Sequence, residues 1–273
     1  MSKKLQVALL GAAGRMGQAL TRIIRDSDEA ELFGGLERSD SPHIGQDMGE
    51  LAGIGPLGVR VEADAEAIFA SADAVIDFST PALTAPSAER AARHGTAYIV
   101  GTSGIGPDDI AALQAAGQRT VVVQGYNMSL GVNLVAALVR QVAAALGPDF
   151  DIEIVEMHHR MKVDAPSGTA VLFGEAAAEG RRVALPEVRD SGRDGITGKR
   201  VPGHIGFAAL RGGNVVGEHT VMFAGEDERI ELTHRAGNRD IFARGALRAC
   251  LWASNQSPGF YTMADVLGLN RPD

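Results

Sequence analysis

The sequence predicts an α/β protein with two domains: a dinucleotide-binding type of α/β domain with a parallel sheet, and a second α+β domain with a mixed, largely antiparallel sheet. Short apolar segments alternate with helical segments through the first half of the chain, as they do in βαβ units. Glycine-rich turns join apolar segments in the last third, as they do in hairpins. A chain of 273 residues is also long enough to bury two cores.

Strands of the first domain are expected where short apolar runs lie between turn residues. These runs are Gln6–Leu10, Ala30–Leu36, Ala74–Phe78, Tyr98–Val100 and Thr120–Gln124. Helices are expected between them, at Met16–Arg25, Ala82–His94 and Pro107–Ala116. Several strands end in small or polar residues, and ligands of an open parallel sheet bind beyond the carboxyl ends of its strands. We therefore expect the functional residues of this domain at that edge.

The pattern changes after Ser129. A long apolar helix is expected at Leu130–Leu146, followed by a strand at Asp151–Met157, a helix that begins near Pro166, and a long loop at Gly180–Gly203. The next expected elements are three strands and a helix, at Ile205–Arg211, Val215–Phe223, Arg229–His234 and Asp240–Ser254. We expect a first domain of residues 1–129, with residues 240–273 packing back on it, and a second domain of residues 130–239.

Composition narrows the class of protein. A net charge of −8 argues against nucleic acid or an anionic membrane as a bulk partner. Cys250 is the only cysteine, which excludes disulfides and a cysteine-rich metal site, and the adjacent histidines lack the spacing of a metal ligand set.

Lys3-Lys4 and the following apolar run imitate a signal peptide, but the run is brief and leads into Arg15. No apolar run is expected to approach the length that spans a membrane, and the expected location is cytoplasmic.

A glycine-rich turn follows the first expected strand and opens the first expected helix, with the sequence Gly11-Ala12-Ala13-Gly14-Arg15-Met16-Gly17. Gly11 permits the tight turn, Gly14 lets the backbone approach a pyrophosphate, and Gly17 allows the helix to pack closely on the strand. The spacing is a variant of the usual dinucleotide fingerprint, and a purely structural turn is the alternative. The position of Glu37, 20 residues after Gly17, favours the dinucleotide site, because a carboxylate there would bind an adenosine ribose.

The charged residues near this turn bear on the choice of cofactor. Glu37 favours NADH, because it would bind the 2′-hydroxyl and repel a 2′-phosphate, whereas Arg15 and Arg38 would neutralise that phosphate. Since both kinds of residue are present, we expect the protein to use NADH and NADPH.

The residues from Glu156 to Ala170 are the most informative segment of the chain. Two histidines, an arginine and a lysine gather within five residues, from His158 to Lys162. The segment Pro166–Thr169 then reads as a helix start, in which Ser167 caps the free backbone amides. Cationic side chains beside a helix N-terminus make a site for an anion such as a carboxylate or phosphate. The alternative, a solvated basic turn before an ordinary capped helix, explains less of this density of charge.

Several motifs in this order resemble the 4-hydroxy-tetrahydrodipicolinate reductase family, also called the dihydrodipicolinate reductase family, of bacterial lysine and diaminopimelate biosynthesis. The resemblance covers essentially the whole chain. Its motifs are Gly11–Gly17, Ile76–Ser79, Gly101–Gly104, Asn127–Asn133, His158–Ala170 and Gly217–Thr220.

The resemblance implies an NAD(P)H-dependent reduction of a cyclic dicarboxylate in which hydride transfer belongs to the nicotinamide. By the same resemblance, residues of the first domain hold the cofactor. Gly11, Ala12, Ala13, Gly14, Arg15 and Met16 would hold the pyrophosphate, Glu37 the ribose, and Arg38 the phosphate of NADPH. The nicotinamide side would be lined by Gly101, Thr102, Ser103, Gly125, Tyr126, Asn127 and Met128.

The resemblance also assigns residues of the second domain. His158 and Lys162 would be catalytic, and His159, Gly168 and Thr169 would bind a substrate carboxylate. The family implies a homotetramer assembled through the sheet of the second domain.

Both His158 and Lys162 are candidate proton donors. A lysine beside a dianionic substrate should stay charged and serve as an anchor, whereas histidine titrates nearer neutral pH, which favours His158 as the donor. Adjacent histidines of one strand face opposite ways, so both can reach one ligand only if the chain turns there.

One residue departs from the family pattern. Met161 stands where a further histidine is often found, which removes one cation or donor and affects substrate affinity or pH response more than the reaction. Two other functions stay open at this point: a related dehydrogenase of another small carboxylate, and a nucleotide-sensing protein without catalysis. The presence of His158 and Lys162 speaks against the sensor, because a sensor needs no proton donor.

Overall fold

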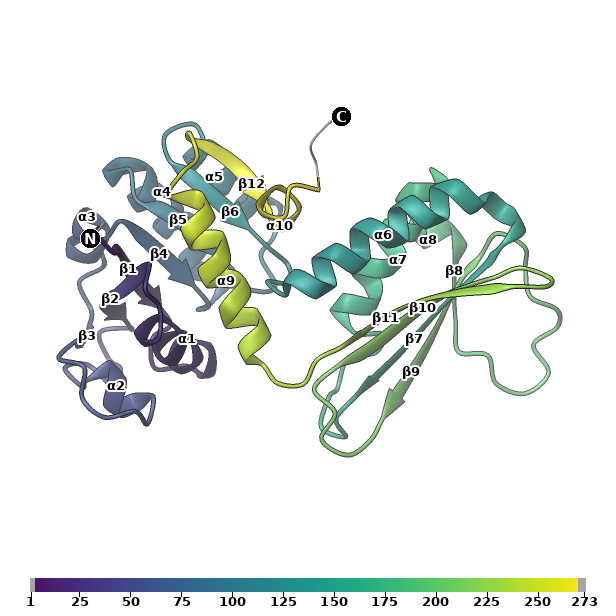
Figure 1. Cartoon of the computed structure of the whole chain (residues 1–273), viewed down its shortest axis with the longest axis horizontal. Coiled ribbons are helices and arrows are strands. Elements are labelled where there is room, and N and C mark those ends of the chain that lie inside the picture. The colour runs from purple at the N-terminus through teal and green to yellow at the C-terminus, as the bar shows by residue number, and fades with distance from the viewer. Residues whose placement is uncertain (1–2, 270–273) are drawn as a thin grey trace. The chain divides into compact units, whose positions relative to one another are not determined.

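The computed structural model describes residues 3–269 and divides the chain into two compact units (Figure 1). The first unit contains the residues up to Leu130 together with those from Asp240 onward, and the second unit is Gly131–Arg239. Each unit has its own sheet, with hydrophobic cores on both faces of the first sheet and on one face of the second. The predicted α/β class, with a parallel sheet and a second mixed sheet, is confirmed.

The sheet of the first unit has seven parallel strands in the order β12-β6-β5-β4-β1-β2-β3. They are β1 (Leu5–Leu10), β2 (Ala30–Leu36), β3 (Val61–Glu62), β4 (Ala74–Asp77), β5 (Ala97–Val100), β6 (Val121–Gln124) and β12 (Gly259–Thr262). Apart from β12, this is the strand order of dinucleotide-binding α/β folds, in which ligands bind where the order reverses beside β1.

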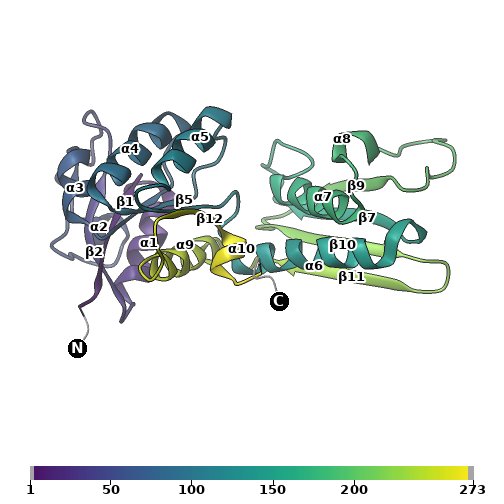
Figure 2. The same ribbon diagram turned by 90° about the horizontal axis from the view of Figure 1, so that it is seen from above.

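Helices cover both faces of this sheet (Figure 2). Val7 and Leu9 of β1 point into a core shared with α1 (Arg15–Arg25) and α9 (Asp240–Ala253). Ala8 and Leu10 point into a second core shared with α3 (Ala65–Ser71), α4 (Thr84–His94) and α5 (Pro107–Ala116). Since alternate residues of a strand face opposite sides, burial on both faces explains why these strands read as continuous apolar runs.

The structure adds short elements that the sequence analysis did not predict: α2 (Met48–Leu51), β3, α3, the 3-10 turn Pro81–Leu83, β12 and α10 (Met263–Val266). Each contains only two to seven residues, too few to show a clear hydrophobic period. Strand β12 exists because Gly259–Thr262 pairs with β6, a partner more than a hundred residues earlier in the sequence.

The second unit contains a five-stranded mixed sheet in the order β11-β10-β7-β9-β8. Its strands are β7 (Asp151–His158), β8 (Arg189–Ser191), β9 (Ile205–Arg211), β10 (Glu218–Ala224) and β11 (Arg229–Arg235). Helices α6 (Leu130–Leu146) and α7 (Gly168–Arg181) pack on one face (Figure 2). Ile152 and Ile154 of β7 lie there in one core with Phe173 of α7. The inward residues of β7 alternate with less buried ones, as in a sheet with one covered face.

Two expectations for this unit were wrong. The segment Gly180–Gly203 is not one structureless loop, because it holds α8 (Leu185–Val188) and β8, which pairs with β9. The expectation that no apolar run approaches membrane-spanning length was also wrong. The run Leu130–Asp149, which includes α6 and the 3-10 turn Gly147–Asp149, is long and apolar enough to cross a membrane by length and composition alone. In the structure Val132, Val139 and Ala143 of α6 lie in the core of the second unit, and a core helix can have this composition too.

Candidate active site

The glycine turn after β1 has the geometry that its sequence predicts. Gly11 has a φ of +81°, and a Cβ atom there would lie 2.9 Å from the carbonyl oxygen of Phe78, so another residue would be strained and crowded. A Cβ atom at Gly17 would lie 2.2 Å from the carbonyl oxygen of Ala12. Within residues 3–269, no side chain caps α1 at Gly14. The start of α1 therefore fits an anionic group such as a pyrophosphate.

Glu37 lies directly after β2, beside the glycine turn. One of its carboxylate oxygens accepts a hydrogen bond of 2.9 Å from the backbone N–H of Ala13. Arg38 turns instead toward Asp40, with 3.4 Å between Nε and the carboxylate, and both side chains are exposed. The structure thus brings Glu37 and the turn residues together and leaves the guanidinium of Arg38 at the surface.

The buried carboxylate of Asp77 links the segments that follow β4 and β5. Asp77, at the end of β4, accepts hydrogen bonds from the backbone N–H of Ser79 at 2.8 Å and the hydroxyl of Thr102 at 2.9 Å. It also accepts one from the hydroxyl of Tyr98, whose pKa is raised because the phenol is buried and faces this carboxylate. A Cβ atom at Gly101 would lie 2.4 Å from the Phe78 ring. Asp77 and Phe78 were not among the predicted site residues. Asp77 was recognisable in the sequence as an acidic residue at the end of an apolar strand.

The remaining predicted residues of this unit follow β5 and β6. Ser103 is exposed and Tyr126 is 70% exposed, whereas Met128 is buried. The side chain of Asn127 accepts a hydrogen bond of 2.8 Å from the backbone N–H of Ser129. Gly125 is packed against sulfur and carbon atoms of Met128 and Met263, so little room exists for a larger residue.

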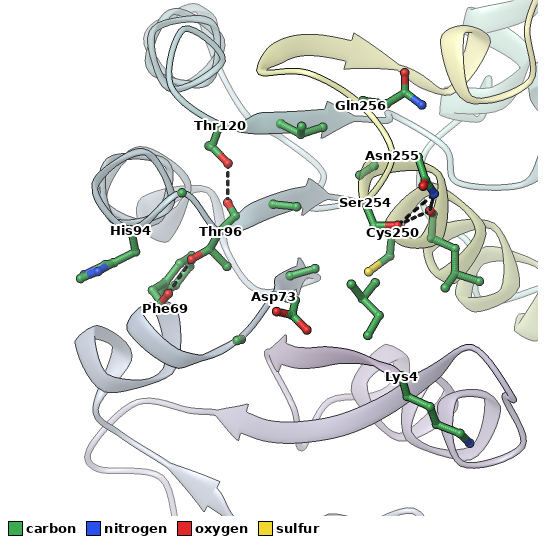
Figure 3. A pocket seen from close by; sticks show the side chains of 18 of the residues that line it. Lys4, Phe69, Asp73, His94, Thr96, Thr120, Cys250, Ser254, Asn255 and Gln256 are labelled. Atoms are coloured by element: carbon green, nitrogen blue, oxygen red, sulfur yellow. Dashed lines mark hydrogen bonds between the residues drawn. The ribbon is translucent and has the colours of Figure 1, made fainter. Parts of the chain in front are cut away.

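A large cavity lies at the opposite edge of this sheet (Figure 3). Its volume is about 790 Å³, and Lys4, Asp73, Thr96 and Thr120 in its wall precede β1, β4, β5 and β6. The hydroxyl of Thr120 donates to the carbonyl of Thr96 at 2.9 Å, and Lys4 donates to the carbonyl of Ser27 at 2.7 Å. Because dinucleotides bind at the carboxyl ends of the strands, this cavity is separate from the predicted cofactor site.

The basic cluster of the second unit follows β7, which ends at His158. The chain then turns, with the carbonyl of His159 accepting a hydrogen bond of 3.1 Å from the backbone N–H of Lys162. The turn that the two adjacent histidines require is therefore present. Both carboxylate oxygens of Asp164 lie 2.8 Å from Nζ of Lys162. Met161 is 77% exposed.

Helix α7 begins at Gly168, six residues after Lys162. The hydroxyl of Ser167 accepts a hydrogen bond of 3.2 Å from the backbone N–H of Ala170, which makes Ser167 the predicted cap. A Cβ atom at Gly168 would meet no described atom within 4 Å. At Gly168 the first turn of α7 therefore has open space beside it, in which a small anion would fit.

Three residues that the sequence analysis did not assign surround His158. Nδ1 of His158 lies 2.7 Å from the buried carboxylate of Glu156, which is also paired with Arg211. The ring of His219 meets the ring of His158 edge to face, with 5.0 Å between centroids. Burial and, to a smaller extent, the charge of His158 lower the pKa of His219 to about 4. Glu156 was detectable as a carboxylate on the apolar face of β7.

Comparison with known proteins decides the family. The family models for the N-terminus and the C-terminus of dihydrodipicolinate reductase match residues 5–128 and 131–267. The chain belongs to the dihydrodipicolinate reductase family. A 4-hydroxy-tetrahydrodipicolinate reductase of Methylocella silvestris is 54% identical over 97% of each chain. Another of Parvibaculum lavamentivorans is 55% identical over 98% of this chain and 100% of its own.

Solved structures agree with this family at the level of the fold. A dipicolinate-bound dihydrodipicolinate reductase from Paenisporosarcina sp. TG-14 matches with a TM-score of 0.76 and 22% identity, over 96% of this chain and 99% of its own. A myo-inositol dehydrogenase from Corynebacterium glutamicum matches with a TM-score of 0.59 and 16% identity, over 94% and 90%. The family fold is thus shared with other dehydrogenases, which by itself assigns no substrate.

Proposed function

We propose that this chain reduces 4-hydroxy-tetrahydrodipicolinate to tetrahydrodipicolinate with NADH or NADPH, in lysine and diaminopimelate biosynthesis. The observation that carries the proposal is the identity of 54% over 97% of a 4-hydroxy-tetrahydrodipicolinate reductase. The open space at Gly168, where α7 begins after His159 and Lys162 in the chain, supports it, because the substrate is a dicarboxylate that needs cationic and amide partners.

The first unit would hold the dinucleotide. Its glycine turn and uncapped α1 fit a pyrophosphate, and Gly101, Thr102 and the residues after β6 would line the nicotinamide side. The bound nicotinamide supplies a hydride to the substrate. Glu37 beside the turn would bind the ribose, and Arg15 and Arg38 would accept the phosphate of NADPH, so both cofactors are expected substrates.

The second unit would bind the substrate and supply a proton. A hydride that reaches one carbon of a conjugated imine leaves the neighbouring carbon in need of a proton. His158 is the proposed donor, because its Nδ1 atom is engaged by Glu156 and its Nε2 atom is the one left to exchange a proton. Lys162 is the proposed second catalytic residue and carboxylate anchor, with His159, Gly168 and Thr169 binding a carboxylate.

We further infer a homotetramer that assembles through the sheet of the second unit. The face of this sheet opposite α6 and α7 carries apolar side chains: Leu210, which is 51% exposed, pairs in register with Met157. Apolar surface of this kind favours association.

A cytoplasmic location fits a chain whose one cysteine, Cys250, is a free buried thiol.

A coupled assay tests the reaction. Pyruvate and aspartate semialdehyde are condensed by a synthase, this protein is added with NADH or NADPH, and the loss of nicotinamide absorbance is followed. We expect oxidation that depends on the synthase and proceeds with both cofactors. Tight cofactor binding without oxidation would overturn the proposal and leave a sensor or another small carboxylate as substrate. Light scattering of the pure protein tests the tetramer.

A further inference from the structure

Glu156 is a buried carboxylate that receives four hydrogen bonds. Its side chain is fully buried. One oxygen accepts from Nη1 of Arg211 at 2.7 Å and lies 2.7 Å from Nδ1 of His158. The other accepts from Nη2 of Arg211 at 2.8 Å and from the backbone N–H of Ser167 at 3.1 Å. A single carboxylate therefore contacts β9, the proposed proton donor and the start of α7.

The surroundings keep this carboxylate ionised. Burial alone would raise the pKa of Glu156, but hydrogen bonds from Arg211, His158 and Ser167 outweigh burial and hold the pKa below its usual value. The guanidinium of Arg211 faces both oxygens, the geometry that best compensates a buried carboxylate. An ionised carboxylate has no proton to donate, so the ring nitrogen that faces it must carry one.

We propose that Glu156 is the positioning residue of this site: it holds His158 with a proton on Nδ1 and Nε2 free to exchange, and holds the N-terminal turn of α7 in place. The proposal rests on the function proposed above. In the protonated ring Nε2 gives its proton to the substrate carbon, and the ring returns to the neutral Nδ1–H form. A carboxylate behind a catalytic histidine acts in this way in hydrolases.

Neighbouring residues leave this arrangement little freedom. A Cβ atom at Gly217 would lie 3.0 Å from Nε2 of His158, so the absence of a side chain there keeps that nitrogen accessible. Nη2 of Arg211 also donates to the carbonyl of Asp164 at 2.7 Å, which connects the same group to the turn that carries Lys162. The carboxylate thus links the proposed proton donor to both segments that would bind the substrate.

The test replaces Glu156 by glutamine and reads the tautomer of His158 from the ring nitrogens by ¹⁵N NMR, without substrate. We expect the Nδ1–H form in the natural protein and a large share of the Nε2–H form in Glu156→Gln, because the amide can donate to Nδ1. In the coupled assay we expect kcat to fall by about 10²-fold or more, with the KM for NADH unchanged.

Glu153→Gln is the matched control. Glu153 lies on the same strand and is also paired with arginines, at 2.9 Å from Arg193 and 2.9 Å from Arg200, but it contacts neither His158 nor α7 through any described hydrogen bond. We expect its variant to keep the His158 tautomer and kcat.

An unchanged tautomer in folded Glu156→Gln, or a kcat within twofold of the natural protein, would overturn the proposal. If Glu156→Gln does not fold, Glu156→Asp carries the same test, because it keeps the charge but withdraws it from Nδ1; an unchanged tautomer there is equally contrary. Since the NMR measurement needs no turnover, it separates failure of this proposal from failure of the reductase assignment.

Discussion

The hydroxyl oxygen of Ser167 lies 2.8 Å from Nε2 of His219, a residue 52 positions later in the sequence. Ser167 also caps α7, and His219 is buried against the rings of His158 and Phe173. The start of the proposed carboxylate site therefore depends on a histidine that must stay neutral in the folded protein.

His219 should make the stability of the protein depend on pH. Its pKa is about 4 in the folded protein, lowered chiefly by burial, against about 6.5 in an unfolded chain. Between these values the unfolded chain binds the extra proton, so stability is present in full above about pH 6.5 and is lost as the pH falls toward 4. We expect this group to remove about 2 kcal/mol between pH 7.5 and pH 5.

Urea unfolding at pH 7.5 and pH 5 measures this effect. His219→Gln should lose less free energy of unfolding over this range than the natural protein, by about the same 2 kcal/mol. His43→Gln, in the first unit, serves as a control and should behave like the natural protein. Equal losses in the natural protein and His219→Gln would contradict the prediction.

His158→Gln should lower turnover chiefly. Loss of a general acid costs about 10²- to 10⁴-fold in rate, and we expect a kcat reduction in this range with little change in the KM for either substrate. Steady-state kinetics in the coupled assay measure it. A kcat close to that of the natural protein would transfer the proton-donor role to another group.

Lys162→Ala should damage both kcat and the KM for the dicarboxylate, because the ammonium, which Asp164 holds at 2.8 Å, would both anchor a carboxylate and assist protonation. Lys199→Ala removes the same charge from the segment before β9 and should leave both constants unchanged. A change in KM alone would assign Lys162 a purely binding role.

Gly217→Ala should lower kcat, because the new Cβ atom would lie 3.0 Å from Nε2 of His158 and 3.6 Å from the His219 ring. We expect at least a tenfold loss, on the order of what a misplaced catalytic group costs. Gly237→Ala is the control, since a Cβ atom there would meet no described atom within 4 Å. Equal kcat values in the two variants would show that His158 tolerates this contact.

Arg38→Ala should raise the KM for NADPH more than the KM for NADH. Arg38 is exposed and paired only loosely with Asp40, at 3.4 Å, so it is available to a 2′-phosphate. Comparing kcat/KM for both cofactors gives the discrimination ratio. A strong preference for one cofactor in the natural protein would count against dual use before any variant is made.

The sequence by itself predicted much of the fold and the local parts of the site. Continuous apolar runs indicated strands buried on both faces, and Gly11, Gly14 and Gly17 marked a strand–turn–helix junction that the structure contains. The segment from His158 to Thr169 also carried its own signal. In each case the residues that interact are near neighbours in the sequence, so their spacing encodes the geometry.

Tertiary structure decided what depends on pairing across the sequence. Arg211 reaches Glu156, 55 positions away, because β9 lies beside β7 in a register that places His158 opposite Arg211. A shift of one residue would turn these side chains to the other face. The same reason explains β8 and β12, which are strands only through their partners. Sequence spacing fixed which groups could do chemistry, and the register of the sheets fixed which of them meet.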